Sequence, residues 1–187
     1  MKDVIWLDIE TTGLDENYHS LLSVGAVKYD DNWQNRQEFH KLVYVPQPDK
    51  LLWSPVALDM HRKSGLYTKI QTPPNPSEAR YNSGTTLPVD ELEQLLISWA
   101  SQGQGLAHKP FILAGNSIQF DRKFIRKQLP YFETQLHYRM IDVSGMAMAF
   151  KLFGGVEVKW PDYSHEALKD ADGSIELLKA CMSHLKS

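Results

Sequence analysis

Two acidic residues, Asp8 and Glu10, directly follow an apolar run at residues 4–7, whose sequence is Val-Ile-Trp-Leu. This run is too short to form a helix and is rich in β-forming residues, so it predicts a buried strand. Side chains two positions apart on a strand project from the same face, which places the two carboxylates side by side. Because adjacent negative charges repel unless a cation lies between them, the pair predicts a divalent metal site. Residues 11–14 leave an alternative, an ordinary hairpin turn with both acids as its solvated flanks.

Asp121, His165 and Asp170 also suit this chemistry, although each has an ordinary explanation when it is taken alone. Asp121 lies at the start of a predicted helix, where the helix dipole favours a carboxylate. His165 and Asp170 are five positions apart, which is about 140° around a helix, so they do not share a helix face. They meet only if His165 enters from the loop or first turn while Asp170 points to the sheet.

Three stretches, in this order along the chain, resemble the motifs of the 3′–5′ exonucleases that use four acids and a histidine. They are Asp8-x-Glu10 with residues 11–14, Asn116-x-x-x-Phe120-Asp121, and His165-x-x-x-x-Asp170. Within this group, which includes the proofreading exonucleases of DNA polymerases, the chain is most similar to the oligoribonuclease family. That closer likeness rests on residues 60–66, 115–118, 121–122, 137–139 and 141–144. The resemblance covers most of the chain and implies a ribonuclease H-like exonuclease fold.

The resemblance implies a catalytic set of five residues: Asp8, Glu10, Asp121, His165 and Asp170. Two metal ions about 3.5–4 Å apart can activate a water and stabilise the leaving oxygen of a phosphodiester. Carboxylates without thiolates select hard cations, so we expect the four acids to hold two Mg²⁺ or Mn²⁺ ions, with Asp8 bridging them. Since an imidazole changes its charge near neutral pH, His165 is expected to take the proton from the attacking water.

The resemblance also implies a set of substrate-binding residues: Thr11, Thr12, Gly13, Leu14, His61, Asn116, Ser117, Tyr138 and Arg139. Leu14 would wedge against the terminal base, while the amides of Thr11 and Thr12 receive the 3′ end. Ser117 and Arg139 would cap the 5′ phosphate of a short substrate, and the planar guanidinium of Arg139 suits bidentate phosphate binding. Tyr138 would be donated by the second subunit of a homodimer.

Two departures from the family pattern could open the site to longer single strands. Val56 stands where an aromatic residue is expected, and Trp53 lies a few residues early. The proline-rich segment at residues 71–88 is longer than the resemblance leads us to expect.

A basic helix face follows Asp121, and it is either a solvated surface or a track for a phosphate backbone. Its residues are Arg122, Lys123, Arg126 and Lys127.

The predicted elements describe an α/β fold. Strands at residues 4–7, 21–29 and 39–45 are joined by short connections, including a turn at residues 30–32, and form an antiparallel meander. Strands at 111–114 and 140–143 then alternate with helices at 88–100, 121–129 and 144–152, after an earlier helix from Ser54-Pro55 to Gly65. The last helix carries an apolar stripe at Leu168, Ala171, Ile175, Leu178, Met182 and Leu185. This order predicts a mixed sheet with helices on both faces, and a surface loop without regular structure at 71–88.

Composition places the chain among soluble globular proteins. Its 187 residues are expected to form a single exonuclease domain, residues 1–187, with 42% hydrophobic and 23% charged residues. No segment approaches the roughly 18 apolar residues of a membrane span, and Asp8 interrupts the first apolar run, so we expect a cytoplasmic protein that does not contact membranes. The single cysteine, Cys181, excludes an internal disulfide and a cysteine-rich zinc site.

The formal net charge of −3 argues against a protein that coats long duplex nucleic acid. Because four of the carboxylates would be committed to metal ions, a short or single-stranded nucleic acid remains a suitable ligand. We therefore expect a metal-dependent 3′–5′ exonuclease that degrades short single-stranded RNA or DNA to nucleoside 5′-monophosphates. A single-strand exonuclease of wider length range is the alternative within this class. A catalytically idle domain that binds nucleic acid or a polymerase is less favoured, since a binding module gains nothing from a repulsive acid cluster.

Overall fold

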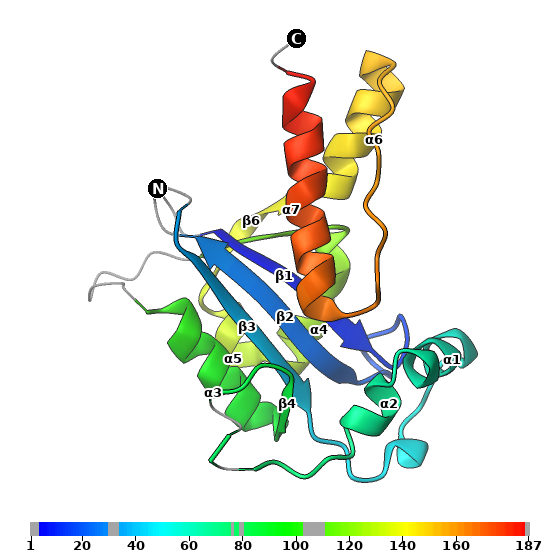
Figure 1. Ribbon diagram of the computed structural model, residues 1–187, viewed down its shortest axis with the longest axis vertical. Coiled ribbons are helices and arrows are strands. Elements are labelled where there is room, and N and C mark those ends of the chain that lie inside the picture. The colour runs from blue at the N-terminus through cyan, green and yellow to red at the C-terminus, as the bar shows by residue number, and fades with distance from the viewer. Residues whose placement is uncertain (1–3, 30–33, 76, 79–80, 103–110, 186–187) are drawn as a thin grey trace.

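A six-stranded sheet with the strand order β4-β3-β2-β1-β5-β6 forms the centre of the computed structural model (Figure 1), which describes residues 4–29, 34–75, 77–78, 81–102 and 111–185. Its strands are β1 (Val4–Thr11), β2 (Leu21–Tyr29), β3 (Arg36–Val43), β4 (Thr85–Leu87), β5 (Phe111–Gly115) and β6 (Leu136–Asp142). The helices are η1 (Pro48–Lys50), α1 (Pro55–Lys63), α2 (Leu66–Lys69), α3 (Val89–Ala100), α4 (Ile118–Gln128), α5 (Pro130–Glu133), α6 (Val143–Gly154) and α7 (Ala167–Ser183). None of the helices described combines the length and the apolar character that a membrane span requires.

The sheet is mixed, as the sequence predicts. β1 pairs antiparallel with β2, and β2 with β3, while β5 runs parallel to both β1 and β6. In this register Trp6 is opposite Ala114, so the end of β5 at Gly115 lies level with Leu7, next to Asp8. The carboxyl ends of β1, β5 and β6 therefore meet at one edge, where ligands of such sheets commonly bind.

Helices cover both faces of the sheet. In Figure 1, α7 crosses in front of β1 and β2, and α3, α4 and α5 lie behind the sheet. Trp6, Ala171 and Ile175 are buried together on the α7 side, whereas Leu7 and Phe124 belong to the core on the other side. This alternation of Trp6 and Leu7 is what a strand buried on both faces requires.

A glycine on β2 sets the position of α7. A Cβ atom added to Gly25 would lie only 2.1 Å from the backbone nitrogen of Leu168, so no larger residue fits there without moving the helix. Gly25 is also the partner of Asp8 in the β1–β2 pairing. The first turn of α7, with Asp170, is therefore brought onto the sheet beside the acids of β1.

Several predicted boundaries differ from the structure. The segment at residues 71–88, predicted to lack regular structure, contains β4, which adds three residues in parallel to the end of β3. Its sequence Thr-Thr-Leu suits a strand, and Gly84 (φ +68°) and Pro88 limit it to that length. α4 begins at Ile118, three residues before the predicted start, and α2 was not predicted because it is a single turn. The turn predicted at residues 30–32 lies outside the described residues.

The apolar stripe on α7 is only partly buried. Ala171 and Ile175 are buried as predicted, but Met182 is 41% exposed and Leu185 is 61% exposed. The last turns of α7 extend beyond the sheet together with α6 (Figure 1), so no strand lies beneath them. Periodicity predicts which side of a helix is apolar, but it carries no information about how far the sheet extends.

Candidate active site

The five predicted catalytic residues come from four separate segments and meet at the edge of the sheet. Glu10, His165 and Asp170 each present one potential metal-ligand atom, and these three atoms lie within 4.8 Å of one another. The backbone nitrogen of Ile9 donates to Asp121 Oδ1 at 3.0 Å, which holds the α4 acid against β1 between Asp8 and Glu10. The structure thus brings the five side chains together, while their individual catalytic roles stay a prediction.

His165 enters from the loop before α7, which is the geometry that the five-residue spacing demands. The backbone nitrogens of Ser164 and His165 donate to the two carboxylate oxygens of Asp170 at 2.8 and 2.9 Å. His165 adopts a left-handed conformation with φ +57°, which costs a non-glycine residue about 1 kcal/mol or more. These two hydrogen bonds offset that cost, and they leave the imidazole exposed beside Glu10.

Burial and mutual repulsion raise the pKa of the acids. Burial, followed by the charges of Asp170 and Glu166, raises the pKa of Glu10 to about 8. The pKa of Asp8 lies well above its ordinary value because of burial, followed by the charges of Asp121, Glu10 and Asp170. Burial likewise raises the pKa of Asp121, although its hydrogen bond to the Ile9 amide opposes this. Carboxylates in this state are stabilised by a positive charge among them, and their oxygens are the donors that hard divalent cations prefer.

Comparison with known proteins assigns the family. Residues 5–71 match a family model described as an exonuclease. An oligoribonuclease of Corynebacterium glutamicum (strain R) is 35% identical over an alignment covering 94% of this chain and 76% of that protein. The chain belongs to the oligoribonuclease family. It is accordingly a 3′–5′ exonuclease, which confirms the resemblance found in the sequence motifs.

Other oligoribonucleases agree with this assignment. The oligoribonuclease of Bordetella pertussis (strain Tohama I) is 32% identical, over an alignment that covers 97% of this chain and 94% of that protein. The mitochondrial oligoribonuclease of Bos taurus is 30% identical, and the alignment covers 94% of this chain and 70% of that protein. Among solved structures, exonuclease I of Methylocaldum szegediense matches 98% of this chain with a TM-score of 0.66 at 15% identity. E. coli exonuclease I in complex with an oligonucleotide matches with a TM-score of 0.58 at 16% identity. This chain spans 41% of each exonuclease I, so these two structures support the fold alone.

The turn after Glu10 is held from beneath by a buried histidine. His61 is fully buried, and its Nε2 donates to the carbonyl oxygen of Thr11 at 2.9 Å while lying 3.6 Å from Glu10 Oε2. Burial lowers the pKa of His61. The ring of Trp53 packs edge-on against the imidazole, with the two ring centres 6.0 Å apart. The sequence predicted His61 as a substrate contact. A side chain without exposed surface instead supports the turn, because a substrate reaches only the outer side of it.

The turn itself offers fewer free groups than expected. The backbone nitrogen of Thr12 donates to the carbonyl oxygen of Ser20 at 2.9 Å, so this amide is not free to receive a 3′ end as predicted. The hydroxyl of Thr11 donates to the carbonyl oxygen of Gly13 at 2.7 Å. Leu14 is 80% exposed at the tip of the turn, a placement that suits a hydrophobic contact with a base.

Asn116 and Ser117 form the link between β5 and α4. The backbone nitrogen of Asn116 donates to Ser174 Oγ on α7 at 3.0 Å, and its side-chain Oδ1 is buried with no hydrogen-bond partner in the described part of the chain. Ser117 adopts φ +51°, and its backbone nitrogen donates to Ser144 Oγ at 3.2 Å. Ser144, capped by Asp142 at the start of α6, was not singled out in the sequence, although it ends one of the matched stretches.

Tyr138 and Arg139 lie on β6, the edge strand two places from β1. Both are exposed, and the guanidinium of Arg139 stacks 5.2 Å from the ring centre of Tyr138. Arg122 supports this strand from behind, since its guanidinium donates to the carbonyl oxygens of residues 137 and 138 and to the carboxylate of Glu133. Arg122 therefore belongs neither to a solvated surface nor to a phosphate track, the two alternatives that the sequence left open for this helix face. A buried arginine with these partners is structural.

Proposed function

We propose that this chain removes nucleotides one at a time from the 3′ end of short single-stranded oligonucleotides and releases nucleoside 5′-monophosphates. The observation that carries the proposal is the convergence of Glu10, His165 and Asp170 within 4.8 Å, with Asp8 and Asp121 beside them. A cluster of acids whose pKa values are raised by burial and by mutual repulsion is unfavourable for folding, and metal-dependent hydrolysis gives it a use. Membership of the oligoribonuclease family favours short RNA as the substrate.

The four acids would hold two divalent ions, Mg²⁺ or Mn²⁺, as the resemblance implies. When bound, such ions activate a water and stabilise the charge of the leaving oxygen. Asp121 already uses one carboxylate oxygen to accept the Ile9 amide, so its other oxygen would be available to bind an ion. His165 is exposed beside Glu10 and takes the proton of the attacking water. Asp170 fixes the loop that carries His165, and it thereby couples metal binding to the position of this base.

Recognition of a short substrate is assigned to both ends of the oligonucleotide. Leu14 would contact the 3′-terminal base at the exposed tip of the turn. Ser117 and Arg139 would bind the 5′ phosphate, and Tyr138, which is 72% exposed, would reach the site of a second subunit. Ser117 lies in the link after β5 and Arg139 lies on β6, so the span between the acids and these two residues sets the preferred length. The protein is proposed to act in the cytoplasm as a homodimer.

Degradation of 5′-labelled RNA and DNA of two to about twenty nucleotides, with Mn²⁺ or with EDTA, tests the proposal. A ladder of products shortened from the 3′ end, dependent on metal and fastest for the shortest RNA, is expected. Asp170→Asn should abolish it. Asp172→Asn is the matched control, since Asp172 lies on the same helix, is partly exposed and pairs with Arg36. Products shortened from the 5′ end, or cleavage in EDTA, would refute the mechanism, and equal rates at all lengths would favour the wider-range exonuclease.

A further inference from the structure

Leu14 is carried by residues 12–20, the Leu14 turn, and this segment closes on itself. The backbone nitrogen of Thr12 donates to the carbonyl oxygen of Ser20, and the backbone nitrogen of Ser20 donates to Thr12 Oγ1, both at 2.9 Å. At the incoming end, the carbonyl oxygen of Thr12 accepts the backbone nitrogen of Ser54, just before α1, at 2.8 Å. The Leu14 turn is therefore a compact loop with its two ends together, and the place of Leu14 depends on what holds those ends.

A bulge lies where the Leu14 turn joins β2. Glu10 is opposite Ser23 in the β1–β2 pairing, but the next residue, Thr11, is opposite Leu21, so β2 has one extra residue here. A bulge of this kind interrupts the ladder of backbone hydrogen bonds and bends the strand locally. The interrupted ladder leaves the outgoing end of the turn to be held by a partner from outside the two strands.

The side chain of Gln128, the last residue of α4, is this partner. Its Oε1 accepts the backbone nitrogen of Leu21 at 2.9 Å, and its Nε2 donates to the carbonyl oxygen of His19 at 3.0 Å. One carboxamide thus binds the backbone on both sides of Ser20 through its acceptor and its donor. Within the described part of the chain, α4 is the only helix that hydrogen-bonds residues 13–20.

One face of α4 holds both strands that flank the turn. Asp121 and Gln128 are seven positions apart, which is two helical turns and only about 20° around the axis, so their side chains leave the helix on the same side. Asp121 accepts the Ile9 amide of β1, and Gln128 accepts the Leu21 amide of β2. α4 therefore carries a predicted metal ligand near its start and holds the Leu14 turn at its end, about 10.5 Å further along the helix.

We propose that Gln128 is a positioning residue for the exonuclease reaction, which holds the Leu14 turn so that Leu14 meets the 3′-terminal base of the substrate. This inference rests on the proposed function, because Leu14 acts only on a bound oligonucleotide. A turn that is already held in place needs no ordering when the substrate binds, and the cost of such ordering would lower the affinity. Loss of the Gln128 side chain should therefore weaken substrate binding and leave the metal site intact.

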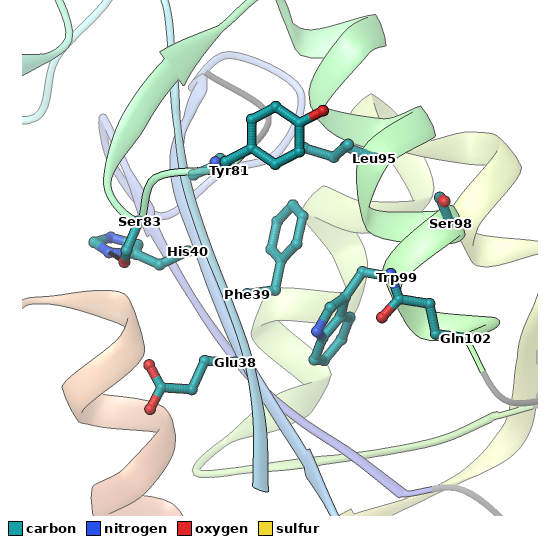
Figure 2. A pocket seen from close by; sticks show the side chains of 10 residues that line it. Glu38, Phe39, His40, Tyr81, Ser83, Leu95, Ser98, Trp99 and Gln102 are labelled. Carbon is teal, nitrogen blue, oxygen red and sulfur yellow. Dashed lines mark hydrogen bonds between the residues drawn. The ribbon is translucent and has the colours of Figure 1, made fainter. Parts of the chain in front are cut away.

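Gln102 provides a matched control for substitutions of Gln128. It lies just after α3, and its side chain lines a cavity of about 170 Å³ between β3 and α3, together with Phe39 and Trp99 (Figure 2). None of the described residues that line this cavity belongs to the Leu14 turn or to the catalytic set. A substitution of Gln102 thus alters a glutamine at the end of another helix without touching the turn.

The kinetic test uses Gln128→Leu, which nearly keeps the size of the side chain and removes both hydrogen bonds. KM for an RNA dinucleotide should rise about 2- to 12-fold, the worth of a typical hydrogen bond, with kcat and Mn²⁺ affinity unchanged. Gln128→Glu, which still accepts the Leu21 amide, should show a smaller rise, and Gln102→Leu should show none. A loss of kcat or of Mn²⁺ affinity as large as the rise in KM would overturn the inference, since it would indicate general damage to the site.

A double-mutant cycle tests whether Gln128 acts through Leu14. In a Leu14→Ala background the turn has no apolar side chain to position, so adding Gln128→Leu should raise KM by less than about 2-fold further. Effects of the two substitutions that multiply in full would contradict the proposed role.

Hydrogen exchange of backbone amides tests the hold on the turn without any substrate. Gln128→Leu should speed exchange of the Leu21 amide and of residues 13–20, whereas Gln102→Leu should leave both as in the wild type. Equal exchange in Gln128→Leu and the wild type would refute the inference whatever the activity. If the wild type cleaves no oligonucleotide while this exchange is faster in Gln128→Leu, the proposed function fails and the hold of Gln128 on the turn stands.

Discussion

At the scale of single residues, Asp170 and His165 illustrate how roles are divided in the site. Asp170 accepts hydrogen bonds from two backbone amides and lies next to Glu10, while His165 is exposed at the end of the same loop. His165→Ala should therefore retain Mn²⁺ binding and lose about 10²–10⁴-fold in turnover, the usual effect of removing a general base. Asp8→Ala should lose both Mn²⁺ binding and turnover. Calorimetric titration with Mn²⁺ and single-turnover assays check this, and undiminished two-site binding in Asp8→Ala would contradict the metal assignment.

The raised pKa of Glu10 predicts that the stability of the metal-free protein depends on pH. Its pKa is raised from 4.5 to about 8 in the folded protein, so the unfolded chain binds fewer protons between these values. The metal-free protein should consequently lose stability as the pH rises from about 4.5 to about 8. Mn²⁺, which replaces the proton, should raise Tm more at pH 8 than at pH 6. Thermal melts in EDTA should show this slope in the wild type and a smaller one in Glu10→Gln, and a Tm that increases through this range would contradict the assignment.

The sequence predicted the convergent residues but not their surroundings. Asp8, Glu10, Asp121, His165 and Asp170 were identified because their types and order match a known pattern, and the structure brings them together. The burial of His61, and of a Ser23 Oγ that has no hydrogen-bond partner among the described residues, were not predictable in the same way. Both depend on what packs above the sheet from distant segments, and neither residue has a local signal in the chain.

At the scale of elements, the contact between β2 and α7 positions half of the site. Gly25 is the one position on β2 where the helix backbone would meet a Cβ atom at 2.1 Å. Gly25→Ala should lower the free energy of unfolding by more than about 3 kcal/mol through overpacking, and it should weaken Mn²⁺ binding by displacing Asp170 from β1. Gly145→Ala is the control, because nothing lies within 4 Å of its added Cβ on α6 and alanine should stabilise the helix by up to about 1 kcal/mol. Urea unfolding and calorimetry distinguish the two, and similar stabilities would contradict this role.

The elements that the sequence predicted well are those with a strong local signal. The helix after Ser54 begins and ends as predicted because Ser54 Oγ accepts the Ala57 amide and Gly65 adopts φ +79°. β4 was missed because three residues bounded by glycine and proline carry little periodicity, and its pairing depends on β3 lying beside it. Local chemistry therefore fixed both ends of α1, while a short element such as β4 depended on tertiary contacts.

At the scale of the whole molecule, the projecting pair of α6 and α7 presents apolar side chains to solvent. Leu152 and Phe153, near the end of α6, are 67% and 89% exposed, and Leu185, just after α7, is 61% exposed. Exposed large apolar side chains are candidates for an interaction surface, and a second copy of the chain is the partner that the proposed homodimer requires. Phe153→Asp should convert the dimer to a monomer in light scattering and lower dinucleotide activity. A monomeric wild type with full activity would remove Tyr138 from the site.

Mixed dimers provide the test of whether Tyr138 acts in the partner's site. Tyr138→Ala and Asp8→Ala should each be nearly inactive alone, the first because every site lacks the donated tyrosine and the second because every site lacks a metal ligand. When equal amounts exchange subunits, half of the dimers are mixed, and each has one site with an intact acid set and an intact tyrosine from its partner. About a quarter of the wild-type activity on dinucleotides should return, because half of the dimers are mixed and one of the two sites in each mixed dimer is complete. Recovery should also require exchange, so it should be absent when Phe153→Asp is added to both chains. If Tyr138 acted within its own chain, every site in the mixture would carry one of the two defects, and no activity would return.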